Sequence, residues 1–440
     1  MTPSAAATAP ERKPLSQFQQ AMLSFYWFAI NVQWSAVLIV LMPSQIKLAV
    51  GNEDKGSALG IALAIGALLS MMIAPAFGAL SDRIRLPGGR RKPWMVIGTI
   101  GNNLGLLGLA YLIRPGETPS LVGWILAFLV VELFSNLASA PYSALIPDIV
   151  PANQRGSASG WMGFMSVLGM FAGGVLGFLL DSLGGITGIY LILIGVMFVG
   201  LLVTFFGVKE PEVYAVRPVT GMQFLHGLIE PFQSSNFTWV FLTRLLVTMG
   251  FYTIQEFLQY YMGDVIGAPF VLPVLGQVAD APEQAASFFL ILLLFGAILS
   301  TLVAGVLSDR HGRKLMVYLS GALMGMVALV FVLTRSFTVA VLMGVVFGVG
   351  YGAYQSVDWA LGADVMPSLD DYAKDMGVWH VAMVLPQVIA TPTAGFLLDN
   401  FQRVGKAQNL PTLGYTVIFL IAVVYFALGT FFVKQIKGIR

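Results

Sequence analysis

Long apolar stretches separated by short polar segments make up most of this chain. A hydrocarbon core of about 30 Å needs roughly 20 apolar residues as helix. Such runs lie near residues 20–42, 57–80, 94–113, 121–146, 157–180 and 186–208, and again near 237–262, 285–307, 314–334, 338–363, 377–399 and 412–433. Because lipid cannot satisfy an open backbone, each run is predicted to be a helix. The pattern therefore predicts an all-α membrane protein with twelve transmembrane helices.

The composition supports a membrane location and excludes several functions. Of 440 residues, 57% are hydrophobic and 10% are charged, whereas soluble domains carry about one quarter charged residues. Cysteine is absent and there are three histidines, so we expect no disulfide, no metal centre and no cofactor. The net charge of +2 is too small to indicate a nucleic-acid partner. The expected partners are the lipid bilayer and a small solute.

Lys and Arg are distributed unevenly between the two sides of the predicted bundle. If the N-terminus is cytoplasmic, 17 of the 24 Lys and Arg residues lie inside and six lie outside, with Arg244 within a span. The positive-inside rule then places both termini in the cytoplasm. No clear cleavage site follows the first apolar run, so we expect a retained helix and a multi-pass protein of the cell (inner) membrane.

The two halves of the chain repeat. GALSDR at 78–83 returns as GVLSDR at 305–310, and ALIPDIVP at 144–151 returns as ALGADVMP at 360–367. Two six-helix units in the same orientation are a plan that transporters use, although a non-transporting receptor could share it. Residues 209–236 form the long polar interior stretch. The predicted organisation is a bundle at 1–208, a cytoplasmic linker at 209–236 and a bundle at 237–440.

The repeated loop residues carry a resemblance to a known family. The first copy has Gly78, Ser81, Asp82 and Arg83 followed by Gly89, Arg90, Arg91 and Lys92, and the second has Gly305, Ser308, Asp309, Arg310, Gly312, Arg313 and Lys314. Both resemble the loop signature of the major facilitator superfamily. The longer first form, SDRIRLPGGRRKPW, is similar to the glycoside-pentoside-hexuronide cation symporters and the related proton-coupled sucrose transporters. PYSALIPDIVPANQRGSASG at 141–160 and residues 358–377 extend the likeness.

The charged residues of these loops suggest a cytoplasmic gate between the halves. A carboxylate is favourable at the N-terminus of a helix, where amide donors and the positive end of the dipole lie. We therefore expect Asp82 to cap the helix near Gly377, and Asp309 to cap the one near Ser157. Further members of the gate are Arg313 and two predicted ion pairs, Arg83 with Asp148 and Arg310 with Asp364. The alternative is that these charges only anchor loops at the lipid headgroups.

Charged residues within predicted spans are costly and usually face a cavity or a partner. Arg244 and Asp358 fall at similar depth on the cytoplasmic side, so we expect them to neutralise each other. A polar and aromatic set near or around the midplane is the candidate solute site. Its members are Asn31, Trp34, Asn103, Glu132, Tyr252, Gln255 and Gln387. Each polar member could instead form a bond between helices.

The identity of the coupling ion is predicted from the absence of acidic residues in the second predicted span, residues 57–80. The resemblance implies a sodium site with acidic residues on that helix, but residues 57–80 contain none. A proton is therefore the better candidate. Glu132 is the favoured carrier and Glu256 the alternative, because burial favours the neutral form of a carboxyl group. Glu256 could also bond to Tyr260 or Tyr261 and be structural.

The function expected from these observations is proton-coupled transport of a sugar or glycoside by a monomer. Export of an amphipathic compound or lipid remains open, because a Met-rich and weakly charged cavity would suit it. A non-transporting membrane sensor is a third possibility. An enzyme is not expected, since the sequence contains no nucleophile with a base, no paired metal-binding helix and no phosphate loop.

Overall fold

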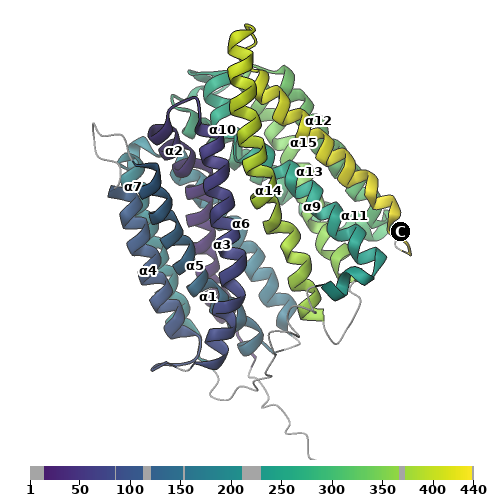
Figure 1. Ribbon diagram of the computed structural model, residues 1–440. Helices are drawn as coiled ribbons and strands as arrows, with labels where there is room; N and C mark the ends of the chain where they lie inside the picture. The colour runs from purple at the N-terminus through teal and green to yellow at the C-terminus, as the bar shows by residue number, and fades with distance from the viewer. Residues whose placement is uncertain are drawn as a thin grey trace, which may run out of the picture.

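The computed structural model describes residues 14–84, 86–111, 120–151, 154–210, 229–365 and 372–438. In Figure 1 the purple-to-blue helices of the first half stand beside the green-to-yellow helices of the second half. Figure 1 also shows that the helices of both halves run roughly parallel to one long direction of the molecule.

The first half begins with one continuous helical rod. It consists of α1 (Gln17–Ala36), a π-helical stretch η1 (Val37–Leu41) and α2 (Met42–Val50), which together form a 34-residue apolar span. Ser16 caps α1, since its hydroxyl accepts a bond from the Gln19 amide at 3.2 Å. The remaining elements are α3 (Lys55–Arg83), α4 (Lys92–Tyr111), α5 (Leu121–Ile149), α6 (Arg155–Phe178), the short η3 (Asp181–Leu183) and α7 (Gly185–Gly207).

The second half repeats this plan with one helix interrupted. It starts with η4 (Glu230–Gln233) and α9 (Ser235–Gln255), followed by α10 (Leu258–Tyr261) and the π-helical η5 (Met262–Ile266). A hairpin of β1 (Phe270–Leu272) and β2 (Gly276–Ala279) comes next. The chain ends with α11 (Pro282–His311), α12 (Arg313–Leu333), α13 (Phe337–Asp364), α14 (Tyr372–Ala407), α15 (Leu413–Phe432) and η6 (Val433–Gln435).

Each of the twelve apolar runs falls on a helix, and eleven spans in the described residues are long and apolar enough to cross a membrane. The run that falls short is α4. This 20-residue helix contains Asn102, Asn103 and four glycines, which lower its mean hydropathy. It nevertheless packs against α5 and α7 like the other helices of the first half.

Two features differ from the all-α prediction of twelve unbroken helices. The run near 237–262 is interrupted at Glu256 and Phe257, between α9 and α10. Apolar residues on both sides of this break conceal it from a hydropathy pattern. The antiparallel β1–β2 hairpin was also not predicted. Gly276 opens β2 with a φ of +72°, a conformation that glycine adopts readily.

Helix packing repeats between the halves. The pairs α4–α5, α1–α7 and α1–α6 in the first half correspond to α12–α13, α9–α15 and α9–α14 in the second. The halves meet through α3 against α14 and α6 against α11. Figure 1 shows α3 and α14 adjacent at the centre of the molecule. The interface is thus built from two helix pairs that the repeat relates to each other.

Glycines permit the closest of these helix contacts. A Cβ atom on Gly169 of α6 would lie 2.5 Å from the carbonyl oxygen of Phe28, and one on Gly173 would lie 2.7 Å from that of Val32. In the second half a Cβ on Gly348 of α13 would overlap the backbone of Leu293. Small residues at such positions let helix backbones approach each other within a membrane.

We name the two ends of the bundle by the segments that lie there. The linker end contains residues 86–91, residues 209–210 and the turn at Gly312. The hairpin end contains residues 51–54, the β1–β2 hairpin and residues 408–412. Helix α3 starts at the hairpin end and finishes at the linker end, whereas α14 runs the opposite way.

Candidate functional site

A buried ion pair lies within the second half, between α9 and α13. Arg244 Nη1 donates to Asp358 Oδ2, and the two side chains are 1% and 2% exposed. The Tyr354 hydroxyl donates to the other oxygen, Asp358 Oδ1, at 3.0 Å. The guanidinium carbon of Arg244 lies 3.5 Å from the ring centroid of Trp379 on α14. The structure therefore brings together the two charges that the sequence placed at similar depth.

Polar and aromatic side chains extend this cluster along one face of α13. Gln355 Nε2 donates to the Tyr351 hydroxyl at 2.6 Å, and the Tyr351 ring stacks on Phe251 with centroids 4.2 Å apart. A cavity of about 20 Å³ lies among them, lined by Arg244, Val247, Thr248, Phe251, Tyr252, Tyr351, Tyr354, Gln355, Asp358 and Met383. We call Arg244, Tyr351, Tyr354, Gln355 and Asp358 the second-half cluster.

Two members of this cluster, Arg244 and Asp358, were predicted from the sequence, and three were missed. Tyr351, Tyr354 and Gln355 precede Asp358 by seven, four and three residues. This spacing places all four on one face of a helix. A search for polar residues on the same face as a charge in a span would have identified them.

A second polar group lies in the first half, around Glu132 of α5. Glu132 is 8% exposed, and its Oε2 accepts a bond from Asn136 Nδ2 at 3.2 Å. Asn136 Oδ1 in turn accepts from the Ser70 hydroxyl of α3 at 2.9 Å. One turn before Glu132, the ring of Phe128 meets Trp34 of α1 edge-on, with centroids 6.3 Å apart. Glu132, Asn136, Ser70, Phe128 and Trp34 form the first-half cluster.

Two of the predicted amides bond to neighbouring helices of their own half. Asn31 Oδ1 accepts from the Ser166 hydroxyl at 2.8 Å, and its Nδ2 donates to the Trp27 carbonyl at 2.7 Å. Asn103 Nδ2 donates to the Ile194 carbonyl on α7 at 3.2 Å. These contacts match the alternative in which such residues hold helices together.

The carboxyl group of Glu256 has a different environment. Its side chain is 1% exposed, and within the described residues neither carboxyl oxygen has a hydrogen-bond partner. The bond to tyrosine considered from sequence is not formed. Tyr260 donates to the Pro43 carbonyl at 2.9 Å and Tyr261 to the Phe331 carbonyl at 3.1 Å, because the helix break redirects this segment.

Within the part of the chain that the structure describes, no hydrogen bond joins any two of the seven predicted solute-site residues. Gln255 lines a cavity of about 10 Å³ with Phe251 and Phe347, and Gln387 is partly buried on α14. Among the described residues, no hydrogen bond or ion pair joins the first-half cluster to the second-half cluster.

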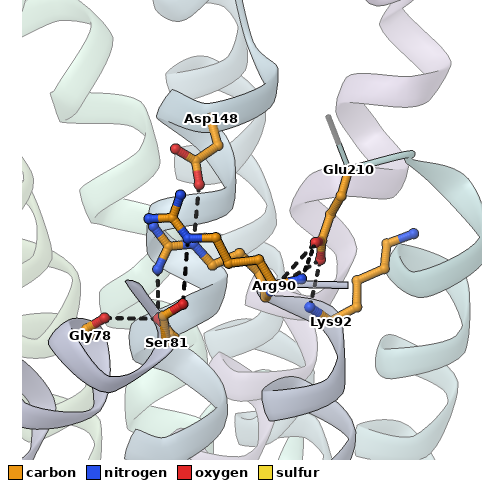
Figure 2. Close-up of polar contacts among 7 residues, drawn as sticks. Gly78, Ser81, Arg90, Lys92, Asp148 and Glu210 are labelled. Atoms are coloured by element: carbon orange, nitrogen blue, oxygen red, sulfur yellow. Dashed lines mark hydrogen bonds and ion pairs between the residues drawn. The ribbon is translucent and has the colours of Figure 1, made fainter. Parts of the chain in front are cut away.

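Figure 2 shows the polar contacts at the linker end of the first half. Arg91 Nε donates to Asp148 Oδ2 at 3.1 Å, and Arg91 Nη1 donates to the Ser81 hydroxyl. The sequence predicts that Asp148 pairs with Arg83, whose side chain lies outside the described residues. Residues 86–89 fold back on themselves through a β-bridge, and this turn delivers Arg91 to Asp148.

Residues at the start of the linker tie α7 to α4. The Glu210 carboxylate accepts bonds from the amides of Arg90, Arg91 and Lys92 at 2.8, 3.2 and 2.6 Å (Figure 2). Lys92 Nζ donates to the carbonyls of Phe205 and Val208 at the end of α7. An acid thus meets the N-terminus of α4 and a base meets the C-terminus of α7, and both arrangements suit the helix dipoles.

The second half has a related arrangement at its linker end. Asp364 pairs with Arg313, whereas the partner predicted from the sequence, Arg310, has an exposed side chain. Arg313 opens α12 directly after the turn at Gly312, so it faces the end of α13. Lys314 Nζ donates to the Ile436 carbonyl, as Lys92 does to Val208. The side chains of Asp82 and Asp309 lie outside the described residues, so the caps predicted near Gly377 and Ser157 stay predictions.

The polar contacts that cross between the halves lie, for the described residues, at the hairpin end. Lys55 Nζ donates to Asp264 Oδ2 at 2.5 Å, and Gln259 Nε2 donates to the Ser44 hydroxyl at 2.6 Å. At the linker end, the ion pairs Arg91–Asp148 and Arg313–Asp364 each stay within one half. The structure is therefore closed by polar contacts at the hairpin end.

Comparisons with known proteins agree on a transport family. The family described as MFS/sugar transport protein matches residues 55–370. The multi-drug resistance efflux pump PmrA of Streptococcus pneumoniae is 23% identical over 296 residues, which is 66% of this chain and 68% of the pump. The sucrose transport protein SUC4 of Arabidopsis thaliana is 24% identical over 190 residues, 40% of this chain and 36% of that protein.

Solved structures share the whole fold. A D-xylose-proton symporter superposes with a TM-score of 0.71 at 15% identity, covering 96% of this chain and 99% of that one. The nucleoside transporter NupG gives a TM-score of 0.71 at 14% identity, covering 96% and 100%. At these identities the likeness concerns the fold alone.

Proposed function

The chain belongs to the major facilitator superfamily, in the family described as MFS/sugar transport protein, and we propose that it moves a sugar or glycoside by proton-coupled alternating access. The observation that carries this proposal is the second-half cluster. Tyr351 and Phe251 offer stacked aromatic rings, and Gln355, Tyr354 and the Arg244–Asp358 pair offer hydrogen-bonding groups inside a span. Sugars present both apolar faces and hydroxyl groups, so this combination suits them.

We further propose that α4 is the twelfth span and that both termini are cytoplasmic. The packing of α4 against α5 and α7 supports the first point, and the excess of Lys and Arg on the linker side supports the second. The linker end is then cytoplasmic and the hairpin end faces outward. A molecule held closed at its hairpin end is inward-facing.

The linker-end charges are proposed to act as a gate that changes partners. In the inward-facing state Arg91 and Arg313 pair with Asp148 and Asp364 inside their own halves. In the outward-facing state, Asp82 and Asp309 would cap helices of the opposite half. Arg83 and Arg310 belong to the same proposed gate.

Glu132 is the proposed proton carrier, with Glu256 as the alternative. Both are buried in the bundle and neither makes a described ion pair. Hydrogen bonds connect the Glu132 carboxyl group to Asn136 and Asn136 to Ser70. The Glu256 carboxyl group has no described hydrogen-bond partner. The solute would then contact groups of both clusters, and Glu132 of the first-half cluster would carry the proton.

Export of an amphipathic compound is a second candidate function. The observation that favours it is that the efflux pump PmrA matches 66% of this chain, compared with 40% for the sucrose transport protein. The chain also contains 20 methionines, whose flexible side chains adapt to varied apolar ligands.

Transport by the purified protein in liposomes separates these functions. We expect uptake of labelled glycosides that Gln355→Ala slows by raising KM, with Gln402→Ala at the hairpin end as a matched control. Extrusion of an amphipathic dye with no uptake of any glycoside would favour the second candidate. Transport of neither would leave the non-transporting sensor as the remaining explanation.

A further inference from the structure

A five-residue sequence occurs twice at the hairpin end of the molecule. GFLLD stands at 177–181, at the end of α6, and again at 395–399, near the end of α14. Both copies pack against a helix of the opposite half, α11 for the first copy and α3 for the second. A Cβ on Gly395 would overlap the backbone of Gly56, so α14 and α3 are in close contact there.

The aspartate of the second copy caps a helix of the other half. Asp399 Oδ1 accepts from the Gly56 amide at 3.0 Å, and Oδ2 accepts from the Ser57 amide at 2.6 Å. These are the second and third residues of α3, whose amides have no partner within the helix. The residue that precedes α3, Asp54, makes no capping bond with its side chain. Asp399 is 2% exposed, so water competes little for these bonds.

A buried ion pair lies beside this cap and also joins the halves. Lys55, the first residue of α3, is 3% exposed and donates to Asp264 of η5 at 2.5 Å. The Tyr415 hydroxyl donates to the same oxygen at 2.6 Å. The first turn of α3 is thus bonded to two elements of the second half, η5 and α14, and Tyr415 of α15 bonds to the same Asp264 oxygen as Lys55.

The aspartate of the first copy makes a weaker contact. Asp181 is exposed, and its carboxylate accepts from the side chain of Gln284, the third residue of α11, at 2.8 Å. A backbone amide of α11 is not its described partner. The two copies therefore differ in burial and in the kind of donor they engage.

We propose that Asp399 is a positioning residue for transport, a latch that holds the outer end closed in the inward-facing state and releases α3 when that end opens. This inference rests on the proposed alternating-access function. Sequence analysis placed Asp82 at the other end of α3 as a cap for α14. The same antiparallel pair of helices would then carry a carboxylate cap at each end, and each cap would form in one state only.

The absence of cysteine from the chain allows a clean test of this latch. Thr391 on α14 is fully buried, and its hydroxyl lies 3.5 Å from the carbonyl oxygen of Gly60 on α3. In a Thr391→Cys protein in lipid nanodiscs, the rate of labelling by a hydrophilic maleimide reports opening of the outer end. Asp399→Asn should raise this rate about tenfold, equivalent to about 1.4 kcal/mol, which lies within the range that charges at helix termini contribute. Asp399→Glu should restore part of the protection.

The matched control is Asp181→Asn, which removes the same charge from the equivalent position. We expect it to change the rate less than twofold. Labelling that is unchanged in a folded Asp399→Asn protein would overturn the latch, and so would equal increases in the Asp399 and Asp181 variants. Because labelling needs no solute, the latch can fail while glycoside uptake succeeds, and the reverse is equally measurable.

Discussion

Removing one member of the Arg244–Asp358 pair should cost far more than removing both. The side chains are 1% and 2% exposed, so either charge left alone would remain in a medium of low dielectric constant. Breaking a buried pair in this way costs about 3–5 kcal/mol. At 1.4 kcal/mol per tenfold change, this corresponds to a decrease of between about one hundred and several thousand fold in the folded-to-unfolded ratio.

The surrounding contacts refine this prediction for each variant. Asp358→Asn leaves Arg244 charged but keeps its position over the Trp379 ring, a contact worth about 2 kcal/mol when desolvated. Arg244→Met loses that contact and leaves the Asp358 carboxylate with the Tyr354 hydroxyl. We therefore expect Arg244→Met to be the more damaging single change. The double variant should recover about 2 kcal/mol relative to the sum of the two.

The assay is the rate of thermal unfolding of the purified protein at one temperature, since unfolding of large proteins is often irreversible. The fold-changes given above are then the upper limits of the change in this rate. Arg313→Gln and Asp364→Asn supply a matched control cycle. That pair is 24% and 39% exposed, and exposed pairs contribute about 0–1 kcal/mol. If the losses of the two single variants at Arg244 and Asp358 simply add in the double variant, the two residues do not stabilise each other and the prediction is wrong. The prediction is also wrong if the interaction energy is the same for both pairs.

Three further predictions concern other charged residues. Asp82→Asn should shift the protein toward the inward-facing state and slow transport while changing solute affinity by only a few fold, as cross-linking between the halves would show. Glu210→Ala should lower the stability of the folded protein by about 2 kcal/mol, measured as a lower Tm, because three amides at the start of α4 lose their acceptor. Glu256→Gln should retain proton-driven accumulation if Glu132 is the carrier, and loss of accumulation would transfer that role to Glu256.

The sequence predicted the helices well because lipid leaves the backbone few choices. It could not reveal the break at Glu256, since apolar residues resume directly after it at Phe257 and Leu258, nor the hairpin that starts near Phe270. The meeting of Arg244 and Asp358 was predictable from depth alone, because a helix converts residue number into height.

Side-chain partners at the linker end were harder to predict. Asp148 pairs with Arg91 because residues 86–89 turn back. A hydropathy pattern does not predict the geometry of such a loop. Tyr351 and Gln355 were missed for another reason. Neutral polar residues in a span are common, and only their shared face with Asp358 distinguishes them.

The most direct test of the account measures solute accumulation by the protein in liposomes when a pH gradient is the only driving force. The wild-type protein should concentrate a labelled glycoside against its gradient. Glu132→Gln, which mimics the protonated carboxyl group, should retain solute exchange and lose this accumulation. Accumulation that persists in Glu132→Gln would contradict the assignment of the proton carrier, and a wild-type protein that moves no glycoside would contradict the proposed function.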